Sequence, residues 1–183
     1  MDPFEVMGLP RQAELADQAL QARYDALSKE RHPDAGGSAE AFEQLQKAHR
    51  ILRSPRQRLV ALMGGEPERG MIPAGLMEFF PKVASWVEEA EGLIKQHDQA
   101  TSALTKAMAA AKIPELQGRG QTLFSKIEAM RDAELAQLSG FDQHGVATSQ
   151  EAMAEVWRAL GFIERWLQQV QGVSQQLFQA MLG

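Results

Sequence analysis

The sequence contains no cysteine among its 183 residues, and tyrosine occurs only once. Without cysteine, disulfide bonds and thiolate metal sites are impossible, and nothing indicates secretion. No stretch approaches the ~20 consecutive apolar residues of a membrane helix. The first ten residues, "MDPFEVMGLP", lack the basic start and apolar run of a secretory signal peptide. We therefore expect a cytoplasmic protein.

An excess of basic charge is also missing, since the formal net charge is −5. Residues 1–63 contain nine acidic and nine basic residues, whereas residues 64–183 contain fifteen acidic and ten basic ones. A nucleic-acid-binding surface needs a basic excess. Neither part of the chain is therefore expected to bind nucleic acid.

Signals for β-strands are almost absent as well. No run alternates apolar and polar positions with β-branched residues, and Ala, Leu, Gln, Glu and Met dominate the sequence. These residues favour helices. The sequence therefore predicts an all-α protein.

The first 63 residues predict four helices. Asp2 and Pro3 combine a capping side chain with a proline at the first helical position, which opens a short helix. Two longer helices are expected over about 17–31 and 39–53, because their apolar residues recur at helical spacing. The capping box Ser54-Pro55-Arg56-Gln57 begins the fourth helix.

Residues 64–73, "GGEPERGMIP", contain three glycines and two prolines and indicate a linker. The region 74–183 then predicts three long helices joined by short connections, and hence an antiparallel bundle. Pro81 either kinks the first of them or marks its start. The segments "KIPELQGRGQ" and "SGFDQHGV" are expected to be non-helical, and the second bundle helix to cover about 121–139.

Metal and catalytic sites receive little support. The four histidines lie far apart, and none forms a His-x-x-x-His or Glu-x-x-His pair. His97 falls on the apolar seam of the first bundle helix, which favours a hydrogen-bonded core histidine. The Gly118-Arg119-Gly120 fragment follows no strand and is not a dinucleotide-binding loop. We expect no metal, no cofactor and no enzymatic activity.

The tripeptide His32-Pro33-Asp34 stands between the two long helices of the first part. Taken alone it is consistent with a turn, because proline fixes φ and aspartate caps locally. Its surroundings are "DPFEVMGL", "ALQARYDALSKERHPD" and "AFEQLQKAHRILRSPRQR". With these segments, residues 2–62 resemble the J-domain of DnaJ-type co-chaperones.

This resemblance implies a four-helix J-domain over 1–63, built around an antiparallel hairpin. It also implies that the loop contacts a DnaK-type chaperone and triggers its ATP hydrolysis. The expected chaperone-binding residues are His32, Pro33, Asp34, Arg23, Lys29 and Arg31. The family usually has a basic outer face on the second helix, whereas here that face reads Ala22, Asp25, Ala26 and Lys29. We therefore expect a weak or specialised interaction with the chaperone.

A J-domain followed by a linker and an acidic helical bundle resembles the HscB family, which delivers the iron–sulphur scaffold protein to HscA. The segments "AGLMEFF" and "VWRALGFIERW" carry this second resemblance. It implies client-binding residues at Leu76, Met77, Phe80 and Phe162. The family acids expected near the first segment are replaced by Pro81 and Ala84.

The large aromatic residues of the bundle leave two interpretations open. Phe79, Trp86, Phe162 and Trp166 lie off the apolar seams, which favours an exposed patch that binds a partner. Alternatively, the wide faces of a three-helix bundle simply bury them.

The main hypothesis is a co-chaperone for iron–sulphur protein maturation. The alternatives are a J-domain protein with an unrelated client or a self-associating bundle, and an enzyme with a site in the bundle. The oligomeric state is open.

Overall fold

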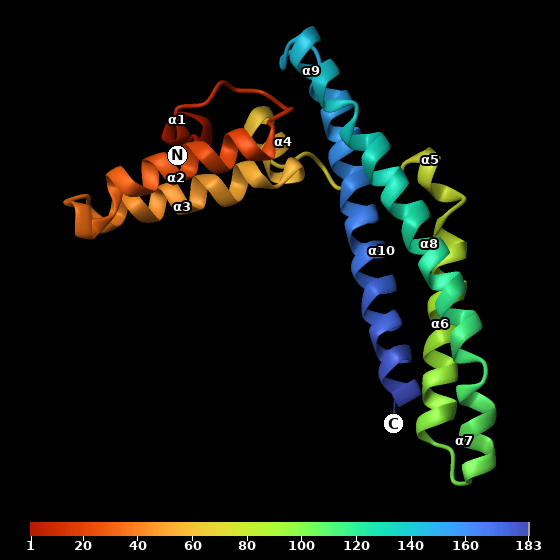
Figure 1. Cartoon of the computed structure of the whole chain (residues 1–183). Helices are drawn as coiled ribbons and strands as arrows, with labels where there is room; N and C mark the ends of the chain where they lie inside the picture. The colour runs from red at the N-terminus through yellow and green to blue at the C-terminus, as the bar shows by residue number, and fades with distance from the viewer. Residues whose placement is uncertain (183) are drawn as a thin grey trace. The chain divides into compact units, whose positions relative to one another are not determined.

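The computed structural model describes residues 1–182, and every secondary-structure element in that part of the chain is a helix (Figure 1). The predicted all-α class is therefore confirmed. The described chain forms two compact units, one of residues 1–70 with 134–157 and one of residues 71–133 with 158–182. Over the same residues, none of the helices combines the length and the apolar character needed to span a bilayer.

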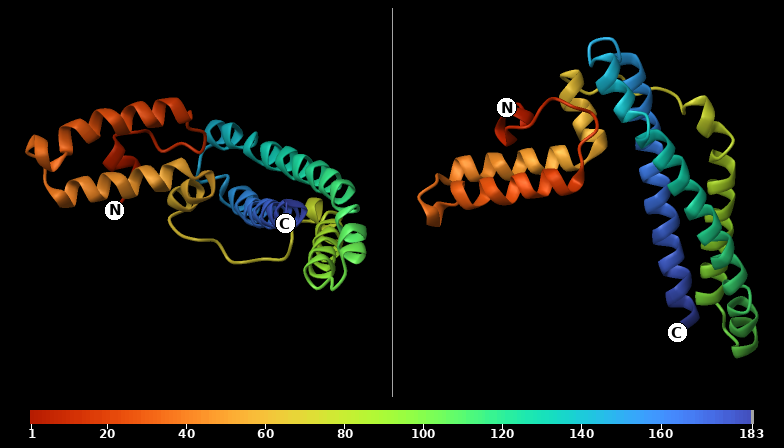
Figure 2. Two further views of the ribbon diagram at one scale, coloured as in Figure 1. Left: turned by 60° about the horizontal axis from the view of Figure 1, so that its bottom comes forward. Right: turned by 45° about the horizontal axis from the view of Figure 1, so that its top comes forward.

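The first unit is built around a helical hairpin. Its two long helices lie side by side in the views of Figures 1 and 2, joined by a short 3-10 turn. Both helices have the bounds that the sequence predicts, because Ser38 caps the second of them and Pro33 follows the first. The elements are α1 (Pro3–Met7), α2 (Asp17–Arg31), η1 (Pro33–Ala35), α3 (Ala39–Arg53) and α4 (Pro55–Met63).

Helix α1 packs across the hairpin and closes its core. The carboxylate of Asp2 accepts a hydrogen bond from the backbone N–H of Phe4 at 2.9 Å, which caps the helix. Phe4 and Met7 are fully buried. Burying an apolar side chain of this size stabilises the fold by roughly 1.5–3 kcal/mol. The buried leucines of the hairpin and α4 complete this core: Leu20, Leu27, Leu45, Leu52, Leu59 and Leu62.

A later segment of the chain belongs to the same unit. Helix α9 (Leu138–His144) buries Leu138 and Phe141. The carboxylate of Asp142 accepts hydrogen bonds from the backbone N–H groups of Ala13 and Glu14, at 2.6 and 2.9 Å. The prediction that "SGFDQHGV" is non-helical was wrong, because most of it forms α9 and only its last residues turn.

The second unit is a bundle of three long helices, α6 (Phe80–Asp98), α8 (Ile113–Leu135) and α10 (Gln150–Leu182). They lie alongside one another in both figures. Two short helices accompany them, α5 (Ala74–Met77) and α7 (Ala103–Ala110).

Prolines mark the beginnings of two bundle helices. Helix α6 begins at Phe80 with Pro81 at its first turn, so the second of the two predictions for Pro81 is correct. Helix α8 begins at Ile113 and contains Pro114 in its first turn. The predicted break over 112–121 was therefore wrong. A first-turn proline sacrifices no intrahelical hydrogen bond, so this proline starts the helix rather than ending one.

Candidate chaperone-binding loop and bundle surface

The tripeptide His32-Pro33-Asp34 lies at the end of the hairpin, where α2 stops and η1 begins. His32 has extended backbone geometry, with φ −63° and ψ 137°. Pro33 then starts the 3-10 turn, and Gly36 closes it in the left-handed region at φ 89°. Proline requires an extended residue before it, which explains why the helix ends here.

The loop is held by its own backbone. The N–H of Gly36 donates to the carbonyl of Pro33, and that of Gly37 donates to the carbonyl of His32, both at 3.0 Å. The ring of Phe42 on α3 meets the imidazole of His32 edge-on, with the centroids 5.0 Å apart. These contacts stabilise the backbone of the tripeptide and the position of the His32 ring.

The imidazole and the carboxylate stand close to each other but remain accessible. Nδ1 of His32 accepts a hydrogen bond from the backbone N–H of Asp34 at 3.2 Å. The carboxylate of Asp34 lies 3.5 Å from the same ring nitrogen. The side chain of Asp34 is 93% exposed. Such a carboxylate can accept charge-assisted hydrogen bonds from a cation of another protein.

Two of the predicted basic residues also have a structural role. The Nε–H of Arg23 donates to the carbonyl of Met7 at 2.9 Å, and Nη1 of Arg31 donates to the carbonyl of Val6 at 3.2 Å. Both arginines therefore hold the C-terminal end of α1 against α2. Lys29 is exposed and forms no ion pair within residues 1–182.

The outer face of α2 is exposed along its length, as its sequence predicts. Ala22, Asp25, Ala26 and Lys29 all face solvent. The inner side is different, because Tyr24 stacks on His49 of α3 with the ring centroids 4.1 Å apart. Burial lowers the pKa of His49 below its ordinary value, and the nearby guanidinium of Arg53 lowers it further.

The predicted client-binding residues divide into two groups. Met77 and Phe80 are strongly exposed, at 61% and 49%. Leu76 is only 4% exposed and packs into the bundle core. The expectation that Leu76 belongs to an exposed patch is therefore wrong, because the short helix α5 turns this side chain inward. Leu76 can support the surface from beneath but offers little area to a partner.

Phe162 on α10 is partly buried against the same core. Its ring lies 6.4 Å from that of Trp166, and the guanidinium of Arg165 lies over it at 4.7 Å. Trp86 and Trp166 are buried, and Phe79 is partly buried. For these three residues the structure supports the interpretation in which the wide bundle faces bury the aromatics.

No group of three or more histidine, aspartate or glutamate side chains within residues 1–182 is arranged to hold a metal ion. His97 is 5% exposed, and its Nδ1 lies 3.2 Å from the carboxylate of the neighbouring Asp98. This confirms the interpretation of His97 as a hydrogen-bonded core histidine.

The hairpin, its exposed tripeptide and the covering helix α1 define a J-domain, and the DnaJ domain model matches residues 2–60. Residues of this region are also similar to Chaperone protein DnaJ 1 of Corynebacterium efficiens, with 33% identity over 69 residues. That similarity covers 36% of this chain and 18% of the relative. It therefore concerns the J-domain alone.

Similarity over nearly the whole chain identifies a narrower family. The chain is 30% identical over 178 residues to the Co-chaperone protein HscB homolog of Burkholderia thailandensis, covering 88% of this chain and 87% of the relative. Chaperone HscB from Vibrio cholerae has a similar structure, with a TM-score of 0.62 and 27% identity. That comparison covers 97% of this chain and 99% of the other. The chain belongs to the HscB family of J-domain co-chaperones.

Proposed function

We propose that this HscB-family protein stimulates ATP hydrolysis by a DnaK/HscA-type chaperone in the cytoplasm and catalyses no reaction itself. It serves the maturation of iron–sulphur proteins. The observation that carries the proposal is the loop of His32, Pro33 and Asp34, which is fixed by its own hydrogen bonds yet exposed. A loop that is ordered before binding loses little conformational entropy on docking.

Positive charge beside the loop supports the same contact. Lys29 is exposed, and Arg23 and Arg31 each use one N–H group to hold α1. A guanidinium has five N–H donors, so both arginines keep donors for an acidic partner. Such charges accelerate association more than they raise affinity. The uncharged Ala22 and Ala26 leave this steering weaker than in a fully basic helix.

For the client, we propose contacts through Met77, Phe80 and Phe162, with Leu76 supporting them from the core. The client is the iron–sulphur scaffold protein. The exposure of Met77 and Phe80 supports this assignment, because large apolar side chains on a surface favour binding to another protein. A J-domain protein with an unrelated client, or a bundle that associates with itself, is the alternative.

The chaperone contact is tested by steady-state ATP hydrolysis of an HscA-type chaperone with His32→Gln and Asp34→Asn. We expect both variants to lose nearly all stimulation and to keep the helical circular dichroism spectrum, because exposed loop substitutions change stability by less than about 0.5 kcal/mol. Asp132→Asn, an equally conservative change on the bundle surface, should stimulate normally. Normal stimulation by both loop variants would refute the proposed contact.

The client contact is tested by calorimetric titration with the scaffold protein. Met77→Ala combined with Phe162→Ala should weaken binding by more than about tenfold, since truncating an apolar hot spot often removes about 2 kcal/mol or more. Chaperone stimulation in the absence of client should be unchanged. If the unsubstituted protein does not bind the scaffold, sedimentation velocity will distinguish self-association from an unrelated client.

A further inference from the structure

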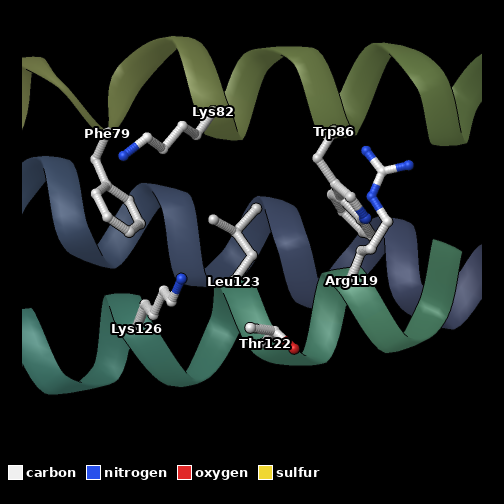
Figure 3. A pocket seen from close by; sticks show the side chains of 7 residues that line it. All are labelled: Phe79, Lys82, Trp86, Arg119, Thr122, Leu123 and Lys126. Carbon is white, nitrogen blue, oxygen red and sulfur yellow. The ribbon is translucent and has the colours of Figure 1, made fainter. Parts of the chain in front are cut away.

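A groove lies between α6 and α8 of the bundle unit, and the residues that line it differ from those assigned to the client contact (Figure 3). Its volume is about 190 Å³. Pockets that enclose a drug-sized ligand or cofactor are typically larger, about 300–1,000 Å³. The groove is therefore suited to side chains of a segment that lies over it. The residues that decide its chemistry are Phe79, Lys82, Trp86, Arg119, Leu123 and Lys126.

The floor of the groove is apolar and fixed. The indole N–H of Trp86 donates to the carbonyl of Leu116 at 3.0 Å. Gly120 lies directly against the indole, because a Cβ atom there would stand 2.4 Å from Cζ2 of Trp86. Leu123 and Phe79 continue the floor along the groove, as Figure 3 shows.

The rim of the groove is basic. The ammonium of Lys82 lies 5.1 Å from the centroid of the Phe79 ring, and Lys126 stands at the same end of the groove in Figure 3. Neither lysine forms an ion pair within the described residues. Arg119, at the Trp86 end, forms two hydrogen bonds with the carboxylate of Glu89, at 2.9 and 2.8 Å.

This concentration of cations is local. The second unit contains nine acidic and nine basic residues and is neutral as a whole. Three of the nine basic residues line this one groove, and of these only Arg119 forms an ion pair within residues 1–182, with Glu89. The two lysines therefore provide positive charge that no ion pair within the described residues neutralises. An acidic ligand complements this charge.

The dimensions point to the kind of ligand. Phe79 is the residue before α6, and Trp86 lies on α6 seven residues later, which corresponds to about 10 Å at 1.5 Å per residue. An extended chain advances about 3.3 Å per residue. About three residues of an extended segment thus fit along the floor. We propose that the groove between α6 and α8 binds an acidic segment of a protein partner, which places an apolar side chain over Leu123 and carboxylates at Lys82 and Lys126.

The test uses the full chain and a fluorescein-labelled peptide of sequence Asp-Glu-Leu-Glu-Asp, followed by fluorescence anisotropy. Lys82→Glu with Lys126→Glu should weaken binding by about tenfold or more, equivalent to about 1.4 kcal/mol. Lys95→Glu with Lys112→Glu makes the same change of charge outside the groove and should alter affinity by less than about twofold, the part due to net charge alone. In NMR titrations, the amide signals of Thr122, Leu123 and Lys126 should shift.

Four outcomes would overturn the proposal. The first is absence of peptide binding, and the second is an equal loss of peptide affinity in both double variants. The third is the same NMR shifts with inorganic phosphate alone at equal ionic strength, and the fourth is tighter binding of a single-stranded oligonucleotide. The second outcome would indicate unspecific attraction, the third a free-anion site and the fourth a nucleic-acid site. The groove does not depend on the proposed chaperone contact. Both double variants should stimulate the chaperone normally. A failure of the groove proposal can therefore be distinguished from a failure of the proposed chaperone contact.

Discussion

Gly37 lies against the backbone of Arg31, so closely that a Cβ atom at position 37 would stand 2.1 Å from the carbonyl oxygen of Arg31. The chain therefore returns past the end of α2 immediately after the His32-Pro33-Asp34 loop. Backbone atoms cannot rotate away as a flexible side chain can. The close approach thus requires glycine, and it fixes the path by which the loop enters α3.

From this contact we expect Gly37→Ala to displace the loop and to destabilise the first unit. The added methyl group must push two backbone segments apart, which typically costs about 1–3 kcal/mol. Urea denaturation measures the change. Gly65→Ala is the control, because a Cβ atom there meets no atom within 4 Å. Equal stability of the two variants would contradict this close contact. Chaperone stimulation should fall in Gly37→Ala alone.

The two hydrogen bonds of Asp142 give a second prediction. Asp142→Asn removes the charge and one acceptor oxygen, so one of the N–H groups of Ala13 and Glu14 loses its partner. Hydrogen bonds to charged groups contribute about 1.5–3 kcal/mol, and we expect a loss near the lower end of that range because Glu14 is exposed. Hydrogen exchange at the Ala13 amide should accelerate.

Asp132→Asn is the matched control for this change. Asp132 pairs with its neighbour Arg131 at 3.3 Å on the exposed surface, where ion pairs contribute little. The unfolding free energy of Asp132→Asn should stay within about 0.5 kcal/mol of that of the unsubstituted protein. Unchanged exchange at Ala13 in Asp142→Asn would show that these hydrogen bonds do not hold the segment in solution.

The elements that the sequence predicts correctly are those with local signals. Helices α2 and α3 begin and end where capping residues, proline and apolar spacing indicate, and the hairpin loop follows from them. Ala13 and Asp142 are 129 residues apart, and nothing near either of them indicates their contact. Arg58 is a similar case. It is 4% exposed and donates to the carbonyl of Leu52 at 2.8 Å, although arginine usually remains at the surface.

The residues of the candidate sites also differ in whether local sequence signals predict their exposure. His32, Pro33 and Asp34 are adjacent in the sequence, so their common exposure could be predicted from the helix ends around them. The burial of Leu76 and the exposure of Met77 depend on how the short helix α5 packs on the bundle. Apolar spacing alone does not specify this packing, because a helix of four residues has no complete periodic face.

The pKa of His49 predicts a pH dependence of stability. Burial lowers this pKa from 6.5, with Arg53 adding to the effect, so the folded protein binds a proton at His49 less readily than the unfolded chain. The contribution of neutral His49 to the stability of the fold is present above pH 6.5. It is lost as the pH falls through 6.5 toward the lower pKa of His49 in the folded protein. NMR titration of the His49 ring should give a midpoint below 6.5.

His49→Phe tests the same linkage by urea denaturation. Phenylalanine can keep the stacking on Tyr24 but cannot bind a proton, so stability should fall less between pH 7 and pH 5 than in the unsubstituted protein. His144→Phe is the control, because this histidine is exposed on α9. Identical pH profiles for the protein and the His49 variant would refute the linkage.

The two glycines of the Gly118-Arg119-Gly120 segment should respond oppositely to the same substitution. Both lie within α8, where alanine is favoured over glycine by about 0.5–1 kcal/mol. At Gly118 a Cβ atom meets nothing within 4 Å, so Gly118→Ala should stabilise the protein by about that amount. At Gly120 it would collide with the rigid indole of Trp86, and overpacking of this kind costs about 1–3 kcal/mol.

Because the two variants differ only in position along one helix, helix propensity cancels between them. Their difference in unfolding free energy, measured by urea denaturation, isolates the contact with Trp86. We expect Gly120→Ala to be less stable than Gly118→Ala by about 1–3 kcal/mol, the cost of overpacking against the indole alone. Trp86→Leu should remove most of this difference, because it replaces the large, rigid indole that a Cβ at position 120 would meet. Equal stability of the two alanine variants would mean that the indole does not rest on Gly120.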